Sequence, residues 1–257
     1  QQGVKEVTLL GQIVTSYGRG VIEKKGGKSA FVQLLEAVHQ VDGIERIRFT
    51  APHPKGYGDD LVEAYGRLAK LVESAHIPVQ SGSNRVLKLM GRGHTRERFL
   101  GIIKKLREVK PDIGICTDII VGFPGETDED FQQTASLIEE AQFDQAFIFK
   151  YSPRQGTKAA SMPEQVPQDV KEERHQYLLS LMNHIGSERY KRYVGREVQI
   201  LVEGPSKKNP ERLMGRTRCN KIVVFEGSTQ HIGNLLDVKI TRAGTFTLYG
   251  APVIFNE

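Results

Sequence analysis

The chain has 257 residues, of which 39% are hydrophobic and 26% charged, a balance typical of globular proteins and sufficient for one large and one small domain. The formal net charge is +5, and no apolar run approaches the ~20 residues that a membrane-spanning helix needs. The two cysteines, Cys116 and Cys219, are too far apart for a metal-binding motif, and the seven histidines show no HxxxH or HExxH spacing. We therefore expect two buried or free thiols in a reducing cytoplasm.

Short apolar runs recur along the first part of the chain and are typical of buried parallel strands. We expect strands at 7–11, 46–50, 76–80, 117–123 and 146–151. The chain begins with Gln1 and enters the first of these runs almost at once. This start predicts a fragment of a longer protein.

Segments with a helical period separate the apolar runs. Apolar residues share one helical face in three of them, at Leu61, Tyr65, Leu68 and Val72, at Phe99, Ile102, Ile103, Leu106 and Val109, and at Phe131, Ala135, Ile138 and Ala141. Thr127 is a favourable N-cap for the third helix, and acidic residues follow it. This alternation predicts an α/β fold with a parallel sheet, open or rolled into a barrel.

The pattern changes near Arg192, after a charged helix that starts at about Gln168. Short strands separated by Gly, Asn and Ser then predict a small all-β barrel, so we expect domains at 1–192 and 193–257. The tail holds nine Lys/Arg against six Asp/Glu, whereas the first 192 residues hold 27 against 25. A basic tail favours a polyanionic partner such as nucleic acid.

The ends of all five predicted strands are rich in Gly, Pro, Ser and Gln. They read "LLGQ", "FTAPHP", "PVQSGSN", "GFPGET" and "YSPRQGT". Ligands of parallel α/β proteins bind at the carboxyl ends of the strands, so five polar ends predict one shared site there. Tight turns alone also explain Gly and Pro in any single loop.

The motifs at these strand ends resemble a known family. "RIRFTAPHP", "IPVQSGSNRVLKLMGRGHT", "DIIVGFPGET" and "FIFKYSPRQGTKAA" resemble, in the same order, the radical S-adenosylmethionine (radical SAM) methylthiotransferases. The tail resembles their TRAM domain, a small RNA-binding β-barrel. "LLGQIVTSYG" resembles the subgroup that acts on isopentenyladenosine in tRNA.

This resemblance implies a partial radical SAM (β/α) barrel followed by a TRAM barrel. It also implies methylthio transfer to the adenosine beside the tRNA anticodon, with S-adenosylmethionine and two [4Fe–4S] clusters as cofactors. A flavodoxin-type electron donor and a monomeric, cytoplasmic enzyme are further expectations. The family holds its radical cluster with three thiolates in a CxxxCxxC loop. This chain has no such loop and resembles the family from the second barrel strand onward, so we expect the fragment to be inactive alone.

The resemblance also implies the positions of the cofactor contacts. They are Gly11, Gln12, Gln80, Ser81, Arg92, Gly122, Pro124, Gly125, Tyr151 and Pro153. Some of these residues have structural alternatives: Gly11 suits an ordinary tight turn, Gln80 and Ser81 suit a helix cap, and Arg92 suits a solvated surface. No catalytic base is expected, because the cofactor carries the radical chemistry.

The tail carries the candidate RNA contacts. Six cations cluster within 15 residues, namely Lys207, Lys208, Arg212, Arg216, Arg218 and Lys221. The alternative is a solvated basic hairpin. Tyr249 lies nearby, whereas Phe225 is predicted to be core.

Three functions remain open at this stage. The first is the enzyme described above, and the second is a cluster-free module that only binds tRNA. The third is a methylthiotransferase that acts on another tRNA adenosine or on a ribosomal protein.

Overall fold

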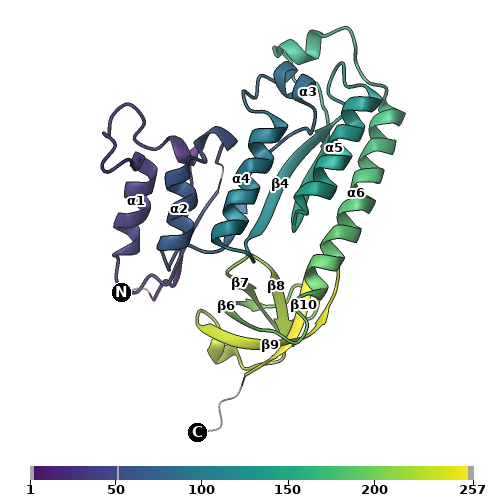
Figure 1. Ribbon diagram of the computed structural model, residues 1–257. Coiled ribbons are helices and arrows are strands. Elements are labelled where there is room, and N and C mark those ends of the chain that lie inside the picture. The colour runs from purple at the N-terminus through teal and green to yellow at the C-terminus, as the bar shows by residue number, and fades with distance from the viewer. Residues whose placement is uncertain (1–2, 51, 254–257) are drawn as a thin grey trace.

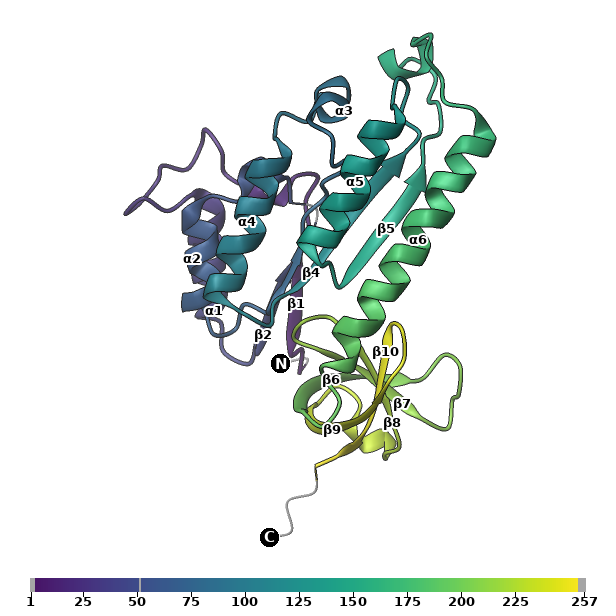
Figure 2. The ribbon, with the colours of Figure 1, turned by 45° about the vertical axis from the view of Figure 1, so that its right-hand side comes forward.

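The computed structural model describes residues 3–50 and 52–253 and has two parts, an α/β core and a small β-barrel below it (Figure 1). The core combines five parallel strands with helices that lie on one side of them (Figure 2). This is the predicted fold class: a partial parallel barrel followed by an all-β barrel.

The core strands are arranged as a pair and a triplet. β1 (Glu6–Leu9) pairs with β2 (Arg46–Phe49), and β4 (Gly114–Val121) lies between β3 (Ser74–His76) and β5 (Gln145–Lys150). All of these pairings are parallel. The chain leading into β3 joins the two groups, because Ile47 donates to the Lys70 carbonyl (2.7 Å) and Val72 donates to the Ile47 carbonyl (3.0 Å).

The third strand is shorter than predicted. The sequence predicts a strand at 76–80, but β3 ends at His76 and the regular ladder with β4 stops there. Beyond it, the Ile77 N–H still donates to the Cys116 carbonyl (2.8 Å), and Gln80 forms a bridge with Ile119. Pro78 explains the difference, because proline has no N–H to donate to a β-ladder. The ladder resumes where Gln80 donates to the Asp118 carbonyl at 2.8 Å.

The core helices follow the predicted apolar stripes in most places. They are α1 (Ala30–His39), α2 (Asp59–Arg67), α3 (Asn84–Leu89), α4 (Arg96–Val109), α5 (Asp128–Ala141) and α6 (Gln168–Lys191), with 3₁₀ turns at 14–16, 54–56 and 158–161. Thr127 caps α5 as predicted, since its hydroxyl accepts from the Asp130 N–H. The helix predicted to include Leu68 and Val72 ends at Arg67, and both residues instead become buried in the segment after it.

Five strands form the closed tail barrel. They are β6 (Glu197–Pro205), β7 (Leu213–Thr217), β8 (Ile222–Phe225), β9 (Leu235–Ala243) and β10 (Thr247–Pro252), in the spatial order β10-β8-β7-β6-β9, with a 3₁₀ turn at 229–231. Alternate residues point inward and make a separate core that includes Phe225, as predicted. Tyr190 and Tyr193, at the end of α6, join that core and connect the barrel to the helix.

The tail barrel contacts the amino ends of the core strands. The guanidinium of Arg46, at the start of β2, is fully buried and donates to the carbonyls of Arg216 (2.9 Å) and Gln199 (3.0 Å). Asp144, just before β5, accepts from the Lys221 ammonium at 2.6 Å. At Gly114, the first residue of β4, a Cβ would lie 2.5 Å from the Cys219 carbonyl oxygen. The carboxyl ends of the strands are therefore left free for a ligand.

None of the helices in the described ranges is both long enough and apolar enough to cross a membrane.

Candidate functional site

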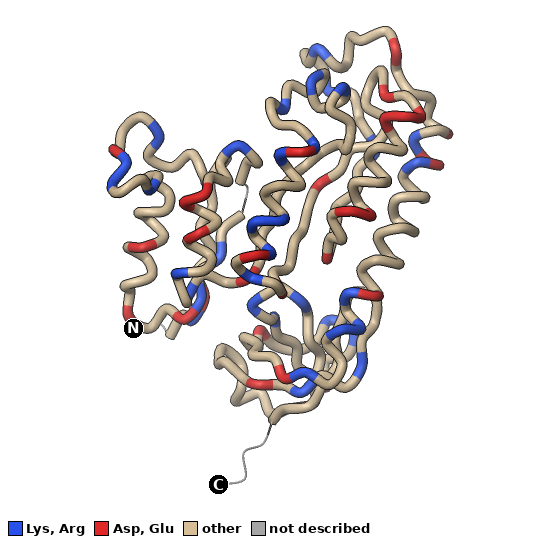
Figure 3. Tube along the Cα trace, in the orientation of Figure 1, with Lys and Arg blue, Asp and Glu red and all other residues tan. Residues whose placement is uncertain are grey.

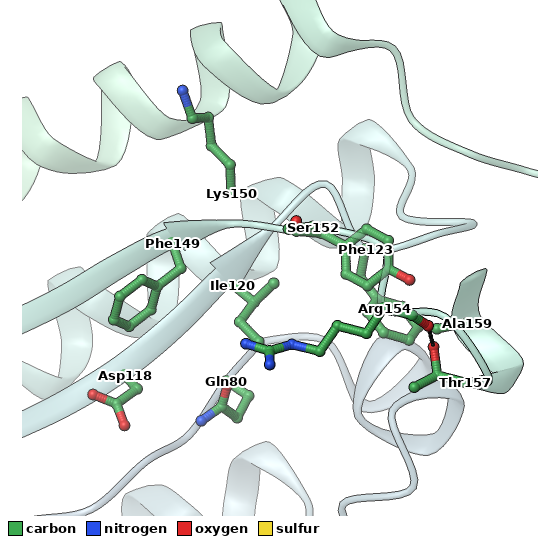
Figure 4. A pocket seen from close by; sticks show the side chains of 11 residues that line it. Gln80, Asp118, Ile120, Phe123, Phe149, Lys150, Ser152, Arg154, Thr157 and Ala159 are labelled. Atoms are coloured by element: carbon green, nitrogen blue, oxygen red, sulfur yellow. Dashed lines mark hydrogen bonds between the residues drawn. The ribbon is translucent and has the colours of Figure 1, made fainter.

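A cavity of about 540 Å³, which we call the strand-end cavity, lies at the carboxyl ends of β4 and β5 (Figure 4). Its lining residues are Gln80, Asp118, Ile120, Phe123, Phe149, Lys150, Tyr151, Ser152, Arg154, Thr157 and Ala159. Its volume falls within the range of small-molecule sites. The lining combines aromatic walls with a carboxylate, an amide and a guanidinium, which suits an aromatic ligand that also carries polar groups.

The open face of the strands supplies the polar and aromatic groups beside this cavity. Side chains alternate along β4, so Thr117 and Ile119 are buried against the helices while Asp118 points to the open face. The Asp118 carboxylate lies 3.0 Å from Nε2 of His76, whose ring meets Phe147 edge-on. Phe147 and Phe149 are 45% and 53% exposed, so this face offers apolar surface to a ligand.

The loop after β5 places a cation in the cavity. The Arg154 side chain reaches across it toward Gln80 and Ile120, and the Thr157 hydroxyl donates to the Arg154 carbonyl at 2.7 Å (Figure 4). Arg154 has no ion-pair partner among the residues that the structure describes. Lys150 points the other way, toward α6, where its ammonium pairs with Glu172. Arg154 is therefore the cation that remains available to a ligand.

The Gly-Phe-Pro-Gly loop after β4 is buried against the protein. The Gly122 N–H donates to Glu126 Oε1 (2.8 Å), and the Gly125 N–H donates to the Glu164 carbonyl (2.7 Å). Arg174 holds the same Glu126 oxygen at 2.7 Å, while burial raises the pKa of this carboxyl. These two backbone donors of the loop are thus already bonded, and its Phe123 side chain is the part that lines the cavity.

The predicted cofactor contacts take up three kinds of position. Gln80 and Tyr151 line the cavity, and Pro153 lies beside lining residues on the exposed loop. Gly11 and Gln12 are exposed at the end of β1, and Arg92 lines a different cavity, next to that strand end. Four buried residues form the structure behind the cavity: Ser81, Gly122, Pro124 and Gly125. The Ser81 hydroxyl lies 3.3 Å from Thr134 Oγ1 on α5, and the residue that caps α3 is Ser83.

Sequence reasoning missed several lining residues, among them Asp118, Phe149 and Arg154. Asp118 carried a usable signal, since it is the one charged residue in the run "CTDIIV". Arg154 followed no such pattern, because its position depends on how the loop after β5 folds back over the strands.

The structure corrects two of the predicted RNA contacts. Lys221 is 1% exposed with its ammonium on Asp144, and Arg218 binds Glu73 (2.6 Å) and the carbonyls of Ala69 and Leu71. Both residues attach the barrel to the core, so neither is free for RNA. Their charge had suggested a solvent-facing surface. The sequence did not reveal their partners, because these lie 145 residues from Arg218 and 77 residues from Lys221.

The other four predicted RNA contacts face solvent. Lys207 and Lys208 are exposed in the turn between β6 and β7. Arg212 pairs with Glu226 and Arg216 with Glu203, each at 3.0 Å, on the outside of the barrel. These pairs are solvent-accessible and weak, so a phosphate can compete for the guanidinium groups.

The cysteines of this chain do not suit an iron–sulfur cluster. A radical cluster needs three thiolates, whereas the chain has two cysteines, Cys116 and Cys219. Burial raises the pKa of the Cys116 thiol to about 12, and the Cys219 sulfur lies 3.1 Å from Thr217 Oγ1 and 3.2 Å from the Tyr193 hydroxyl. No group of three or more His, Cys, Asp or Glu side chains arranged to hold a metal occurs within residues 3–50 and 52–253.

Comparison with known protein families agrees with this architecture. The model of the radical SAM superfamily matches residues 1–138, more than half of the chain. The chain belongs to the radical SAM superfamily. The TRAM domain model matches residues 191–253 of this radical SAM chain, the part that folds as the tail barrel. Members of the superfamily use S-adenosylmethionine together with an iron–sulfur cluster.

Curated relatives match the radical SAM chain along nearly its whole length. Proteins named tRNA-2-methylthio-N(6)-dimethylallyladenosine synthase from Opitutus terrae and Akkermansia muciniphila are 55% and 52% identical over 97% of it. The chain covers 52% and 54% of those proteins, so it spans about half the length of the curated relatives that it matches. The solved structure of coproporphyrinogen III oxidase from Escherichia coli is 12% identical, with a TM-score of 0.49 over 90% of this chain and 58% of that one.

Proposed function

We propose that the chain is the core and RNA-binding tail of a tRNA methylthiotransferase. This enzyme would add a methylthio group to isopentenyladenosine beside the anticodon by radical SAM chemistry. The observation that carries the proposal is the set of curated relatives that share one name, which are 46% to 55% identical to this chain. The strand-end cavity and the basic tail barrel are the features that such a function needs.

Two lining residues from the prediction, Gln80 and Tyr151, are the proposed contacts of S-adenosylmethionine, together with Asp118 and Arg154. The Asp118 carboxylate can accept from ribose hydroxyls or the ammonium group, and Arg154 can donate to the carboxylate. Bound S-adenosylmethionine supplies the radical and methyl-transfer chemistry. Four further contacts of S-adenosylmethionine remain proposed outside the lining: Gly11, Gln12, Arg92 and Pro153. The strand-end cavity wall is held in place by Ser81, Gly122, Pro124 and Gly125.

Both proposed [4Fe–4S] clusters need ligands that this chain does not supply. With its two distant cysteines, the chain is proposed to act within a longer protein whose other residues hold the clusters. A flavodoxin-type electron donor, a monomeric state and a cytoplasmic location belong to the same proposal.

The proposed RNA contacts of the tail barrel are Lys207, Lys208, Arg212 and Arg216. Their charge suits the phosphate backbone, which dominates RNA affinity and makes it dependent on salt. The domain boundary near residue 192 remains part of this proposal.

Mass analysis of tRNA nucleosides tests the reaction. A strain without the gene should lose the 2-methylthio form of isopentenyladenosine and accumulate isopentenyladenosine, and the intact gene should restore it. Loss of a methylthio group from another adenosine, or from a ribosomal protein, would refute the proposed substrate. Unchanged methylthio groups on every tRNA and on the ribosomal proteins would refute the enzyme altogether.

A second candidate is a cluster-free module that only binds tRNA, which the low cysteine count favours. This function predicts salt-dependent tRNA binding by the gene product with no change in any modified nucleoside when the gene is lost.

A further inference from the structure

A second cavity, of about 710 Å³, lies between the loops that follow β1 and β2 and the segment 91–98, which comprises the turn before α4 and the start of α4. Five cations line it, contributed by all three segments, and Asp60 is the one carboxylate in its described lining. The cations are Arg19, Lys24, Lys55, Arg92 and Arg98. Basic segments above α1 and at the top of α4 are visible in Figure 3. We call this cavity the rim cavity.

The cations of the rim cavity carry charge that no carboxylate neutralises directly. None of the five forms an ion pair with the part of the chain that the structure describes, and Asp60 Oδ2 already accepts from the Ser29 N–H at 2.8 Å. The tail barrel differs, because carboxylates hold Arg212, Arg216, Arg218 and Lys221. The rim cavity therefore concentrates more uncompensated positive charge than the surface that the sequence singled out.

The shape of the rim cavity is fixed by close packing between its loops. A Cβ at Gly56 would overlap the Thr15 side chain, whereas a Cβ at Gly93 would meet only the movable end of the Lys55 side chain. Gly93 also has φ +63, a conformation that favours glycine. Burial lowers the pKa of His53, and the positive charges of Arg92 and Lys55 lower it further. The loops thus hold several cations around one space, where an anion relieves their mutual repulsion.

We propose that the rim cavity binds backbone phosphates of the RNA substrate. The inference rests on the proposed function for the identity of the substrate. Arg92 is also a proposed contact of S-adenosylmethionine, which leaves four other cations in the lining. A single small anion needs one or two cations, whereas four suit successive phosphates of a polynucleotide. The rim cavity opens at the carboxyl ends of the strands, as the strand-end cavity does. Phosphates bound here hold the anticodon loop beside the proposed site of chemistry.

The salt dependence of tRNA binding tests this site directly. The purified chain is titrated with labelled tRNA by fluorescence anisotropy between about 50 and 200 mM salt, a range over which phosphate contacts weaken strongly. One variant carries Arg19→Gln, Lys55→Gln and Arg98→Gln. The control carries Arg67→Gln, Lys105→Gln and Lys191→Gln, which remove the same charge from exposed cations that already pair with Glu36, Asp59 and Glu188.

The rim variant should lower the magnitude of the slope of log K against log salt by about 2 to 3, as expected from about one unit for each phosphate contact. The control should change it by less than about 1, and matching thermal melts establish that both variants fold. Equal slopes for the two variants would overturn the proposal. The outcome does not depend on methylthio transfer, so a chain that passes this test and modifies no tRNA would defeat only the proposed function.

A second arm separates RNA phosphates from the carboxylate of S-adenosylmethionine. The rim variant should bind S-adenosylmethionine, measured by calorimetry, within about threefold of the unmodified chain, a difference below 1 kcal/mol. A rim variant that loses S-adenosylmethionine and keeps its RNA slope would assign the cavity to the cofactor and refute the RNA site.

Discussion

Asp130 shows how one side chain connects several elements. It is 3% exposed and closes the capping box of α5 with Thr127. Its carboxylate also accepts from the Ser83 hydroxyl at 2.5 Å and pairs with Arg85. Burial favours the neutral acid, but the hydrogen bonds from Arg85, Ser83 and Thr127 outweigh it and lower the pKa of Asp130 to about 2.

Replacing Asp130 with Asn should lower the free energy of unfolding by about 2–3 kcal/mol at pH 7, the range that its pKa shift corresponds to. The folded-state pKa lies below the unfolded value, so this stabilisation is present above the unfolded pKa of about 3.9 and disappears as the pH falls toward 2. Urea unfolding of both proteins between pH 7 and pH 2 measures the difference. A difference that stays constant with pH would show that the Asp130 charge contributes nothing.

Local patterns predicted residues of this kind better than distant contacts. Thr127 was identifiable as a cap because its partner is three residues away. Gln80 and Tyr151 were placed at the cavity because strand ends converge in a parallel sheet. Lys221 and Arg218 were misplaced because their partners come from the α/β core, and no local pattern reveals such contacts.

At the scale of elements, the turn from β4 into α5 depends on a glycine. Gly122 has φ +70, and a Cβ there would run into the Lys171 side chain on α6. Gly156 provides a comparison. Its φ is +81, but a Cβ there would have no neighbouring atom of the described residues within 4 Å. The first glycine thus meets both a backbone and a packing requirement, whereas the second meets only the backbone one.

Gly122→Ala should therefore destabilise the chain more than Gly156→Ala. The left-handed conformation costs each variant about 1–2 kcal/mol, and crowding against Lys171 adds about 1–3 kcal/mol to the first alone. Chemical denaturation gives both values. Equal losses would mean that Lys171 moves aside freely and that α6 does not hold the turn in place.

The strand-end cavity is assembled from the segment after β3, the ends of β4 and β5, and the loops that follow these two strands. Arg154→Gln should weaken S-adenosylmethionine binding by about tenfold or more, since a hydrogen bond to a charged group contributes about 1.5–3 kcal/mol. Lys150→Gln serves as the control, because Lys150 lines the same cavity but turns toward Glu172. Calorimetry that finds the same loss for both variants would count against a direct contact from Arg154.

For the whole molecule, the two parts contact each other at a polar interface. Asp144 accepts from Lys221 (2.6 Å), Arg189 (3.0 Å) and the Ile115 N–H (2.9 Å), so β4, α6 and the barrel meet at one carboxylate. Burial alone would raise the pKa of Asp144, but the two cations hold it below its usual value.

The barrel lies at the amino ends of the strands and both cavities at the carboxyl ends, so an RNA that touches all of them must extend along the core.

The ion pair between Asp144 and Lys221 should make the core and the barrel unfold together. Lys221→Met leaves the buried carboxylate with one cation fewer, a change that typically costs about 3–5 kcal/mol. Hydrogen exchange measured by mass spectrometry should then show β6–β10 opening before the core, whereas in the unmodified chain both parts exchange with similar opening free energies. Arg212→Gln, at an exposed pair, should change the opening free energy of neither the barrel nor the core by more than about 1 kcal/mol.

Adding Asp144→Asn to Lys221→Met should restore part of the loss, because the Asp144 charge no longer remains buried without Lys221. If the barrel already opens separately in the unmodified chain, the interface does not couple the two parts.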